Sequence, residues 1–410
     1  MSAENSADFD LVIVGAGMAG AALALAVADL PIKVALIEAQ AVREGWPAID
    51  DSVFDYDARV SALTESSRGF LDELGAWSDI VSRRACAYTD MEVWDGEGTG
   101  RIHFAASEVK RAALGHIVEN RLINASLING LRENARVKCF FGMPVETMDR
   151  QQGLISLKLA GGKLVRSPLV VAADGANSKI REWAGFVTRE WDYHHHAIVA
   201  TVETESAHKN TAWQRFLPEG PLAFLPLSDA AGEQRYCSIV WSVKPDIAEA
   251  LMSLGDDDFC RELAAKFEHR LGSVVACSRR FSFPLRQRHA ADYVSDGVVL
   301  LGDAAHTIHP LAGQGINLGF QDAMALADEC RRACERGLSL SDTGVLNRYQ
   351  RRRKGGNLAM MAMMEGFQHL FETPAMPLRL LRNTGMRWLD SALPLKRQII
   401  AKAMGLSDKP

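Results

Sequence analysis

The sequence predicts an α/β fold, with a parallel sheet flanked by helices, a second sheet and a helical C-terminal region. Short apolar runs at 9–14, 34–37, 169–173 and 297–301 have the composition of buried parallel strands. The first run leads directly into a glycine-rich turn followed by small residues, which is the pattern of a strand that turns tightly into a helix. Alternating or apolar segments between about 189 and 286 indicate the second sheet.

Composition limits the class of protein. The chain has 410 residues, of which 48% are hydrophobic and 24% charged, enough for one large folding unit or two closely joined domains. The formal net charge is -5 and the isoelectric point is about 6.1, so no overall basic field attracts nucleic acid. We therefore expect no nucleic-acid partner.

Cysteine usage and the N-terminus predict a cytoplasmic protein. The seven cysteines include no C-x-x-C pair, which favours reduced thiols over a disulfide framework or a zinc site. The first ten residues carry no Lys or Arg, unlike a secretory signal. The uncharged run 11–28 is interrupted by glycines, so a nucleotide-binding unit explains it better than a membrane span.

The N-terminal segment has the features of a dinucleotide site. Gly15 permits a tight turn, Gly17 lets a diphosphate approach the backbone, and Gly20 allows the following helix, expected over 21–28, to pack on the strand. The strand at 34–37 ends on Glu38, whose carboxylate can accept hydrogen bonds from a ribose diol. This motif does not distinguish FAD from NAD.

Two later segments follow strands in the same way. The run 169–173 leads into Asp174 and Gly175, which alone would be an ordinary β-turn. The run 297–301 leads into Gly302 and Asp303. The order and separation of the three motifs resemble the group A flavoprotein monooxygenases, the family of para-hydroxybenzoate hydroxylase, across nearly the whole chain.

The resemblance implies a Rossmann-like FAD-binding domain with an interleaved β-sheet substrate domain and a C-terminal helical region. It also implies that Glu38 binds the adenosine ribose, that Asp303 binds the ribityl and diphosphate region, and that Asp174 and Gly175 serve FAD and the nicotinamide. Arg59 is placed near the flavin, with a solvated loop arginine as the alternative. The residues expected to bind FAD are Gly15, Gly17, Gly20, Glu38, Arg59, Asp174, Gly175, Gly302, Asp303, Gly313, Gln314, Gly315, Ile316 and Asn317.

The glycine-rich segment 310–319 suits a planar ring system. Glycines at 313 and 315 let the main chain approach a flavin, and a helix expected over 315–329 would direct its positive end towards the reduced ring. His306, Pro310 and Gly313 are the candidate catalytic positions. For His306, ordering of the flavin loop is the open alternative.

Further stretches narrow the resemblance. Residues 91–95, 114–120, 191–193, 195–197, 222–227 and 302–315 resemble the ubiquinone-biosynthesis hydroxylases, and among these the bacterial 2-octaprenylphenol hydroxylases, which oxidise ring carbon C5. The resemblance implies hydroxylation of a polyprenylphenol by O2 through a C4a-hydroperoxyflavin, with NADPH or NADH as the reductant. A second G-x-G-x-x-G motif is absent from the sequence, so we expect the nicotinamide to visit a groove on the FAD and substrate domains.

The predicted domains follow from this resemblance. The FAD-binding domain is expected over 1–188, with a substrate-domain segment near 85–110, and again over 287–345, which holds the flavin loop and helix. The substrate-binding sheet is expected over 189–286, and a helical region over 346–410. His194, His195 and His196 lack ligand companions at suitable spacing, so no metal site is predicted.

The C-terminal segment 367–410 is basic and amphipathic. Its Lys and Arg residues interleave with apolar side chains, which suits peripheral contact with the inner face of a membrane or docking on another ubiquinone-biosynthesis protein. The alternative is that these helices cover the core of their own chain.

The sequence leaves other functions open. The same motifs suit a monooxygenase for a water-soluble phenol, and also an FAD-binding subunit of a biosynthetic complex without turnover of its own. Prenyl-chain reduction or halogenation also occurs on this fold, although the Trp-x-Trp-x-Ile-Pro segment of flavin halogenases is absent from the sequence. A flavin-free NAD(P)H dehydrogenase leaves 302–303 and 310–319 unexplained.

Overall fold

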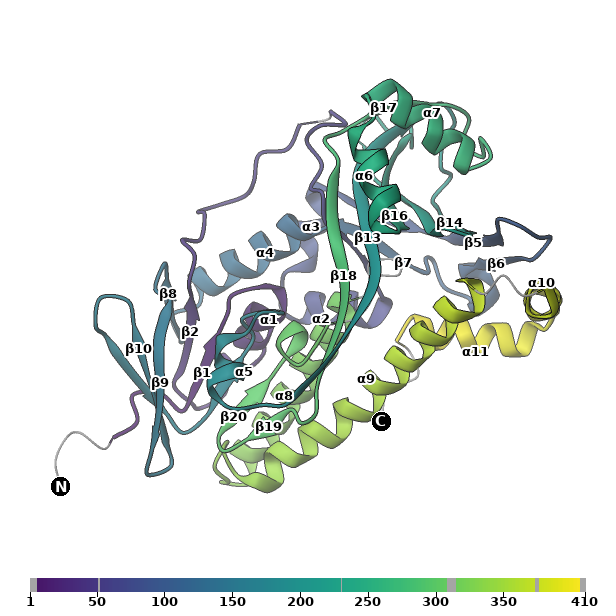
Figure 1. Cartoon of the computed structure of the whole chain (residues 1–410). Coiled ribbons are helices and arrows are strands. Elements are labelled where there is room, and N and C mark those ends of the chain that lie inside the picture. The colour runs from purple at the N-terminus through teal and green to yellow at the C-terminus, as the bar shows by residue number, and fades with distance from the viewer. Residues whose placement is uncertain (1–5, 51, 230, 308–314, 373–375, 406–410) are drawn as a thin grey trace.

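The computed structural model describes residues 6–50, 52–229, 231–307, 315–372 and 376–405. Within these ranges the strands form four sheets. Helices pack beside the six-stranded sheet, and helices also form the C-terminal part of the chain (Figure 1). The predicted mixed α/β architecture is confirmed.

A six-stranded sheet forms the centre of the nucleotide-binding part, with the order β19-β20-β12-β1-β2-β8. All neighbouring pairs are parallel except β19 with β20. Its strands are β1 (Leu11–Val14), β2 (Val34–Glu38), β8 (Val137–Phe141), β12 (Val170–Ala172), β19 (Val294–Ser295) and β20 (Val298–Leu300). Every residue of β1, β12 and β20 is buried, because helices or loops cover both faces of a parallel sheet.

Three helices pack together beside this sheet, since α1 contacts both α4 and α8. They are α1 (Met18–Ala26), α4 (Asn120–Glu133) and α8 (Gly315–Glu335), and shorter helices nearby are α2 (Glu65–Glu73), α3 (Trp77–Arg83) and α5 (Lys179–Trp183). Helix α1 begins three residues before the predicted start, because Gly17 serves as its N-cap. Helix α8 begins at the predicted residue and runs six residues further, to Glu335.

A nine-stranded sheet lies beside the first unit, with the order β21-β18-β13-β16-β15-β14-β5-β6 and with β17 paired to β13. Figure 1 shows the long strands β13 and β18 running side by side between the two units. The strands are β5 (Asp90–Asp95), β6 (Arg101–Ala105), β13 (Thr188–Thr204), β14 (Thr211–Leu217), β15 (Gly220–Pro226), β16 (Tyr236–Val243), β17 (Val274–Cys277), β18 (Phe281–Ala290) and β21 (His306–Thr307). Helices α6 (Pro245–Ser253) and α7 (Asp256–Lys266) pack on its outer face around Trp241 and Phe259.

The segment near 85–110 contributes β5 and β6 to this sheet, although the rest of the sheet comes from beyond residue 187. The domain boundaries themselves stay a prediction. Two three-stranded sheets complete the fold, β3-β7-β4 and β11-β10-β9. Their strands are β3 (Val60–Leu63), β4 (Ala85–Tyr88), β7 (Gly115–Glu119), β9 (Val145–Gln151), β10 (Leu154–Leu159) and β11 (Leu164–Ser167).

The chain ends in three helices, α9 (Thr343–Glu372), α10 (Met376–Ser391) and α11 (Leu393–Ala403). Arg382 of α10 is buried and pairs with Asp95 of β5 at 2.6 Å. Lys396 of α11 is also buried and pairs with Glu108 at 2.8 Å. These two cations therefore attach the C-terminal helices to their own chain. Among the described helices, none combines the length and the apolar composition that a membrane span requires.

Candidate functional site

The strand order places the three sequence motifs along one edge of the six-stranded sheet. Strands β20, β12, β1 and β2 are neighbours and parallel, so their carboxyl ends point the same way. Gly15 follows β1 directly, Asp174 and Gly302 lie in the segments after β12 and β20, and Glu38 is the last residue of β2. Ligands of open α/β sheets bind at such an edge, where the strand order reverses on either side of β1.

The three glycines of the first motif have different surroundings. Gly15 has φ of +107°, and a Cβ there would overlap the Ala173 carbonyl group. A Cβ at Gly20 would overlap the carbonyl oxygen of Gly15. Gly17 is different, because a Cβ there would meet no atom within 4 Å. Gly15 and Gly20 therefore serve the turn and the contact between helix and strand, whereas Gly17 leaves open space at the N-terminus of α1.

Glu38 connects β2 to the glycine turn. Its carboxylate accepts a hydrogen bond from the Ala16 amide at 2.8 Å and one from the Gln40 amide at 2.9 Å. Each carboxylate oxygen retains a further lone pair, so Glu38 can still accept from a ribose hydroxyl. The amide bonds hold the side chain in place before a ligand arrives.

Asp174 has one occupied and one unoccupied oxygen. Its Oδ2 atom accepts hydrogen bonds from the amides of Lys179 and Ile180, at 2.9 and 3.3 Å, at the start of α5. Its Oδ1 atom is buried and has no hydrogen-bond partner within the described part of the chain. Burial raises the pKa of this carboxyl, and the hydrogen bonds oppose that effect. A buried acceptor without a partner is unusual in a native protein and fits a ligand donor.

Gly302 and Asp303 form a 3-10 turn, η3 (Gly302–Ala304), directly after β20. Asp303 is open to solvent on one side, but the surrounding protein removes part of its water and so raises the pKa of its carboxyl. The positive charges of His306 and Arg59 oppose this effect. The structure therefore brings Arg59 close enough to Asp303 to act on its charge.

The backbone around Arg59 is held by neighbouring acids. The Asp57 carboxylate accepts a hydrogen bond from the Arg59 amide at 3.1 Å, and the Asp57 amide donates to Glu119 at 2.7 Å. The amide of Asn120 donates to the Arg59 carbonyl at 3.0 Å. The Arg59 guanidinium lies over the Phe283 ring, 5.0 Å from its centroid. Arg59 is thus an exposed but anchored side chain.

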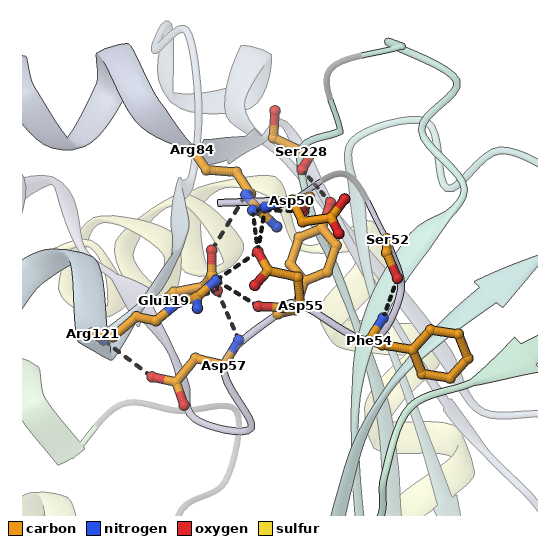
Figure 2. A network of polar contacts seen from close by, with 10 residues as sticks. Asp50, Ser52, Phe54, Asp55, Asp57, Arg84, Glu119, Arg121 and Ser228 are labelled. Atoms are coloured by element: carbon orange, nitrogen blue, oxygen red, sulfur yellow. Dashed lines mark hydrogen bonds and ion pairs between the residues drawn. The ribbon is translucent and has the colours of Figure 1, made fainter. Parts of the chain in front are cut away.

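Behind this loop lies a cluster of paired charges, shown in Figure 2. Asp55 pairs with both Arg84 and Arg121 at 3.1 Å, and Glu119 pairs with Arg121 at 2.9 Å. Arg84 and Glu119 are almost fully buried. Buried charges of opposite sign keep each other in place, because separating them would leave one unpaired. The cluster therefore connects the Arg59 loop to β4 and β7.

His306 is buried behind the η3 turn, with 2% of its surface exposed. Its Nε2 atom lies 2.5 Å from Oδ2 of Asp322, and the same oxygen accepts the Gly302 amide at 3.1 Å. Oδ1 of Asp322 accepts from Nε of Arg353 at 2.7 Å. These contacts favour the ordering role for His306 over a catalytic one.

Charge pairing explains the state of Asp322. Burial acts to raise its pKa, but the charges and hydrogen bonds of His306 and Arg353 prevail and lower it to about 2. Sequence reasoning missed both Asp322 and Arg353. One signal was available for Asp322. It is an acid next to Ala323, on the face of the predicted helix that carries the apolar residues, and acids on such a face are rare unless they are paired.

The start of α8 holds the last predicted residues. Gly315 and Ile316 begin the helix, and a Cβ at Gly315 would meet no atom within 4 Å. The side chain of Asn317 is used inside the protein, because it donates to the Ala62 carbonyl at 2.8 Å and accepts from Ser67 at 2.7 Å. Pro310, Gly313 and Gln314 lie outside the described residues.

These features fit FAD. Four features lie along one edge of the sheet: the open approach at Gly17, the N-terminus of α1 without a side-chain cap, the Asp174 oxygen without a partner, and the anchored Arg59. Backbone N–H groups at a helix N-terminus suit a diphosphate. The arrangement can therefore hold a dinucleotide with its diphosphate at α1.

Comparison with known proteins identifies relatives of the whole chain. The model of the FAD binding domain family matches residues 8–356. The chain is 38% identical to 3-demethoxyubiquinol 3-hydroxylase of Escherichia coli strain K12, over 97% of this chain and 98% of the relative. It is 33% identical to the mitochondrial ubiquinone biosynthesis monooxygenase COQ6 of Xenopus tropicalis, over 98% and 95% of the two chains.

The fold is also similar to that of a solved structure. The crystal structure of p-nitrophenol 4-monooxygenase PnpA from Pseudomonas putida DLL-E4 superposes with a TM-score of 0.77, at 20% identity, over 98% of each chain. At this identity the similarity concerns the fold alone. It agrees with the para-hydroxybenzoate hydroxylase-like architecture predicted from the motifs.

Proposed function

Since this chain belongs to the FAD-dependent hydroxylases of ubiquinone biosynthesis, we propose that it hydroxylates the aromatic ring of a polyprenylated ubiquinone precursor. The observation that carries the proposal is the position of Ala62. Its carbonyl accepts a hydrogen bond from Asn317 at the start of α8, and its side chain lines a cavity on the inner face of the nine-stranded sheet. A ring on that face lies beside the end of the helix that would approach the flavin.

The reaction balances as one ring C–H bond converted to C–OH, with NAD(P)H and a proton reducing the second oxygen atom of O2 to water. FAD, when bound, supplies the activation of oxygen. The protein's contribution is to hold the ring in position and to exclude water.

The residues that would hold FAD are those along the sheet edge. We assign the adenosine ribose to Glu38, the diphosphate to the amides that follow Gly17, and the ribityl and diphosphate region to Asp303 with Arg59. Asp174 has an oxygen free to accept a hydrogen bond from a ligand. His306 supports Asp303 from behind through Asp322.

The reductant is NADPH or NADH. The sequence contains one G-x-G-x-x-G motif, at 15–20, and FAD would occupy it. We therefore place the nicotinamide transiently in a groove shared by the FAD and substrate domains.

Two ring positions are candidates. The sequence segments that resemble 2-octaprenylphenol hydroxylases favour C5 of a 2-polyprenylphenol. The Escherichia coli relative is named for hydroxylation at position 3 of demethoxyubiquinol, and this favours a later precursor. We propose C5 as the hydroxylated position and position 3 as the second candidate. The structure of the product distinguishes the two.

The C-terminal helices offer a surface for the lipid environment of such a substrate. Trp388 of α10 is 61% exposed, and Leu395, Ile399 and Lys402 recur at helical spacing on α11 and are all exposed. Further exposed residues there are Arg387, Leu393 and Arg397. We call these seven residues the C-terminal surface and propose that it contacts an anionic membrane, because apolar and basic side chains together suit that interface.

Apolar residues of α11 pack close to the inner face of the nine-stranded sheet. Ile400 and Met404 of α11 pack in one cluster with Tyr88, Met91 and Phe104. Tyr88 and Met91 also line the cavity next to Ala62. A prenyl tail that followed this cluster would lead from the ring towards the C-terminal helices.

The test uses FAD-reconstituted protein, NADH or NADPH, oxygen-18 gas, and short-tailed forms of both candidate precursors. We expect NAD(P)H oxidation that depends on the prenylphenol, and one labelled oxygen in the ring by mass spectrometry. Fragmentation of the product then locates the new hydroxyl at C5 or at position 3.

The same experiment separates the alternatives. Labelled product from water-soluble phenols but from neither prenylated precursor would assign the chain to soluble substrates. Bound flavin without labelled product from any phenol would instead indicate an FAD-binding subunit that needs a partner for turnover.

A further inference from the structure

Strand β14 presents a glutamine side chain, Gln214, to the inner face of the nine-stranded sheet. Successive side chains of a strand point to opposite faces. Trp213 and Arg215 point outward, where Trp213 packs against the cluster under α6 and α7 and Arg215 pairs with Glu268 at 2.9 Å. Ala212 and Gln214 therefore point inward, towards the β3-β7-β4 sheet.

Gln214 has no hydrogen-bonding neighbour on this face. It is 6% exposed, and its side-chain amide makes no hydrogen bond with any residue that the structure describes. The residues opposite it on the adjacent strands are Ala223 and Val93, neither of which can bond to it through its side chain. The amide oxygen and nitrogen are not fully buried, so they remain accessible from the cavity and can meet a ligand there.

A second residue with a polar group, Tyr88, lines the same cavity from the other sheet. Tyr88 of β4 lies over Gly115 of β7, where an added Cβ would stand 2.7 Å from the Tyr88 hydroxyl. That hydroxyl has no hydrogen-bond partner among residues with described positions. Burial raises the pKa of Tyr88 to about 12, so the hydroxyl stays protonated and can donate at neutral pH.

The space between the two groups is small and otherwise apolar. The cavity measures about 20 Å³ and its other walls include Ala62, Met91, Ile117 and Leu225. A cavity of this volume can hold one water-sized group, such as a single oxygen substituent, but it cannot hold a whole ring. A ring oriented with its oxygen in this cavity keeps its carbon edge near Ala62, which Asn317 holds at the start of α8.

We propose that Gln214 and Tyr88 bind the phenolic oxygen of the substrate ring and thereby determine which ring carbon faces the flavin. This inference rests on the proposed function. The amide oxygen of Gln214 can accept the phenolic proton, and the Tyr88 hydroxyl can donate to the phenolic oxygen. Accepting that proton raises electron density on the ring, and the two contacts discriminate against rings without a free hydroxyl.

The test compares a short-tailed 2-prenylphenol with its methyl ether in wild type, Q214L and Y88F. For wild type we expect a strong preference in kcat/KM for the free phenol. In Q214L the ratio of the two kcat/KM values should fall by about 10- to 100-fold, with a larger fraction of electrons released as hydrogen peroxide. Y88F, which removes only the hydroxyl, should lower the ratio by about 3- to 10-fold.

Gln287 provides the matched control. It is also a buried glutamine of the nine-stranded sheet, but its amide bonds to Tyr193 and it does not line the cavity. Q287L should therefore perturb the sheet while the phenol preference stays within about twofold of wild type. FAD affinity should be unchanged in Q214L and Y88F, since neither residue contacts the FAD edge of the six-stranded sheet.

An unchanged preference in Y88F and Q214L would overturn the inference while leaving the proposed function in place. If Q214L fails to fold, Y88F decides the question alone. If wild type forms no hydroxylated product, the proposed function fails instead. The inference is then decided by the dissociation constants of the phenol and the ether, measured from flavin fluorescence in the same variants. Equal loss of affinity for both ligands would contradict it.

Discussion

Oδ2 of Asp322 lies 2.5 Å from Nε2 of His306, inside the protein and directly behind the turn that carries Asp303. The opposite oxygen of the same carboxylate accepts from Arg353 of α9 at 2.7 Å. Three successive elements of the chain, the turn after β20, α8 and α9, are thus joined through one buried carboxylate. The position of the turn that carries Asp303 consequently depends on residues of α8 and α9.

Replacing Asp322 with Asn should reduce both stability and cofactor affinity. Arg353 would keep its buried charge without compensation, which costs about 3–5 kcal/mol of unfolding free energy. The Gly302 turn would also lose an anchor, so the dissociation constant for FAD should rise. Urea unfolding and FAD titration measure the two effects. D328N, a change to an exposed ion-paired acid on the same helix, is the control and should cost less than about 1 kcal/mol.

Acidification should destabilise the protein through His289. Burial lowers the pKa of this imidazole from 6.5 to about 4, and the positive charges of His306 and Lys354 add to the effect. Between these two pH values the unfolded chain binds a proton that the folded chain does not, so stability falls as the pH decreases from 6.5 to 4. The contribution should be on the order of 1–3 kcal/mol.

The pH prediction is checked by urea unfolding at several pH values in wild type and H289Q. The variant should show a flatter dependence over this window. H194Q alters a histidine of β13 whose side chain is 87% exposed, and its profile should match wild type. A wild-type slope retained in H289Q would mean that another group binds the proton.

Two glycines of the same motif should respond differently to alanine. In Gly15→Ala, the alanine would have to adopt a φ of +107°, and its Cβ would overlap the Ala173 carbonyl group. The variant should therefore be strongly destabilised or fail to fold. Gly17→Ala meets no protein atom and should fold normally. Its methyl group would occupy the approach to α1, and FAD affinity should fall at least tenfold. Thermal melting and FAD titration distinguish these outcomes, and normal FAD affinity in Gly17→Ala would place the diphosphate elsewhere.

The C-terminal surface should bind anionic vesicles. We expect the protein to sediment with phosphatidylglycerol vesicles at low salt and to be released as salt increases, because basic side chains supply part of the attraction. Replacing Leu395 and Ile399 with Ser should abolish sedimentation without changing FAD content. R136E, a charge reversal at an exposed arginine outside the C-terminal helices, is the control. Sedimentation unaffected by the Leu395 and Ile399 changes would exclude α11 as the contact.

Local sequence was sufficient for the nucleotide-binding elements. The strand, turn and helix around Gly15 follow from residues within about twenty positions of one another, because one βαβ unit forms its main contacts with itself. The start of α8 at Gly315 was predictable for the same reason. The end of α8 at Glu335 was not predictable in this way, because α8 packs against α9, a contact that the local sequence does not show.

Partners and burial were decided only by the tertiary structure. The basic C-terminal pattern did not reveal that Arg382 is buried against Asp95, 287 residues earlier, while Trp388 stays exposed. Periodicity likewise could not show that Gln214 faces a cavity without a partner. A sequence pattern determines which face of an element is apolar, but the neighbour of a polar side chain comes from a distant part of the chain, and its position is known only when both elements have packed.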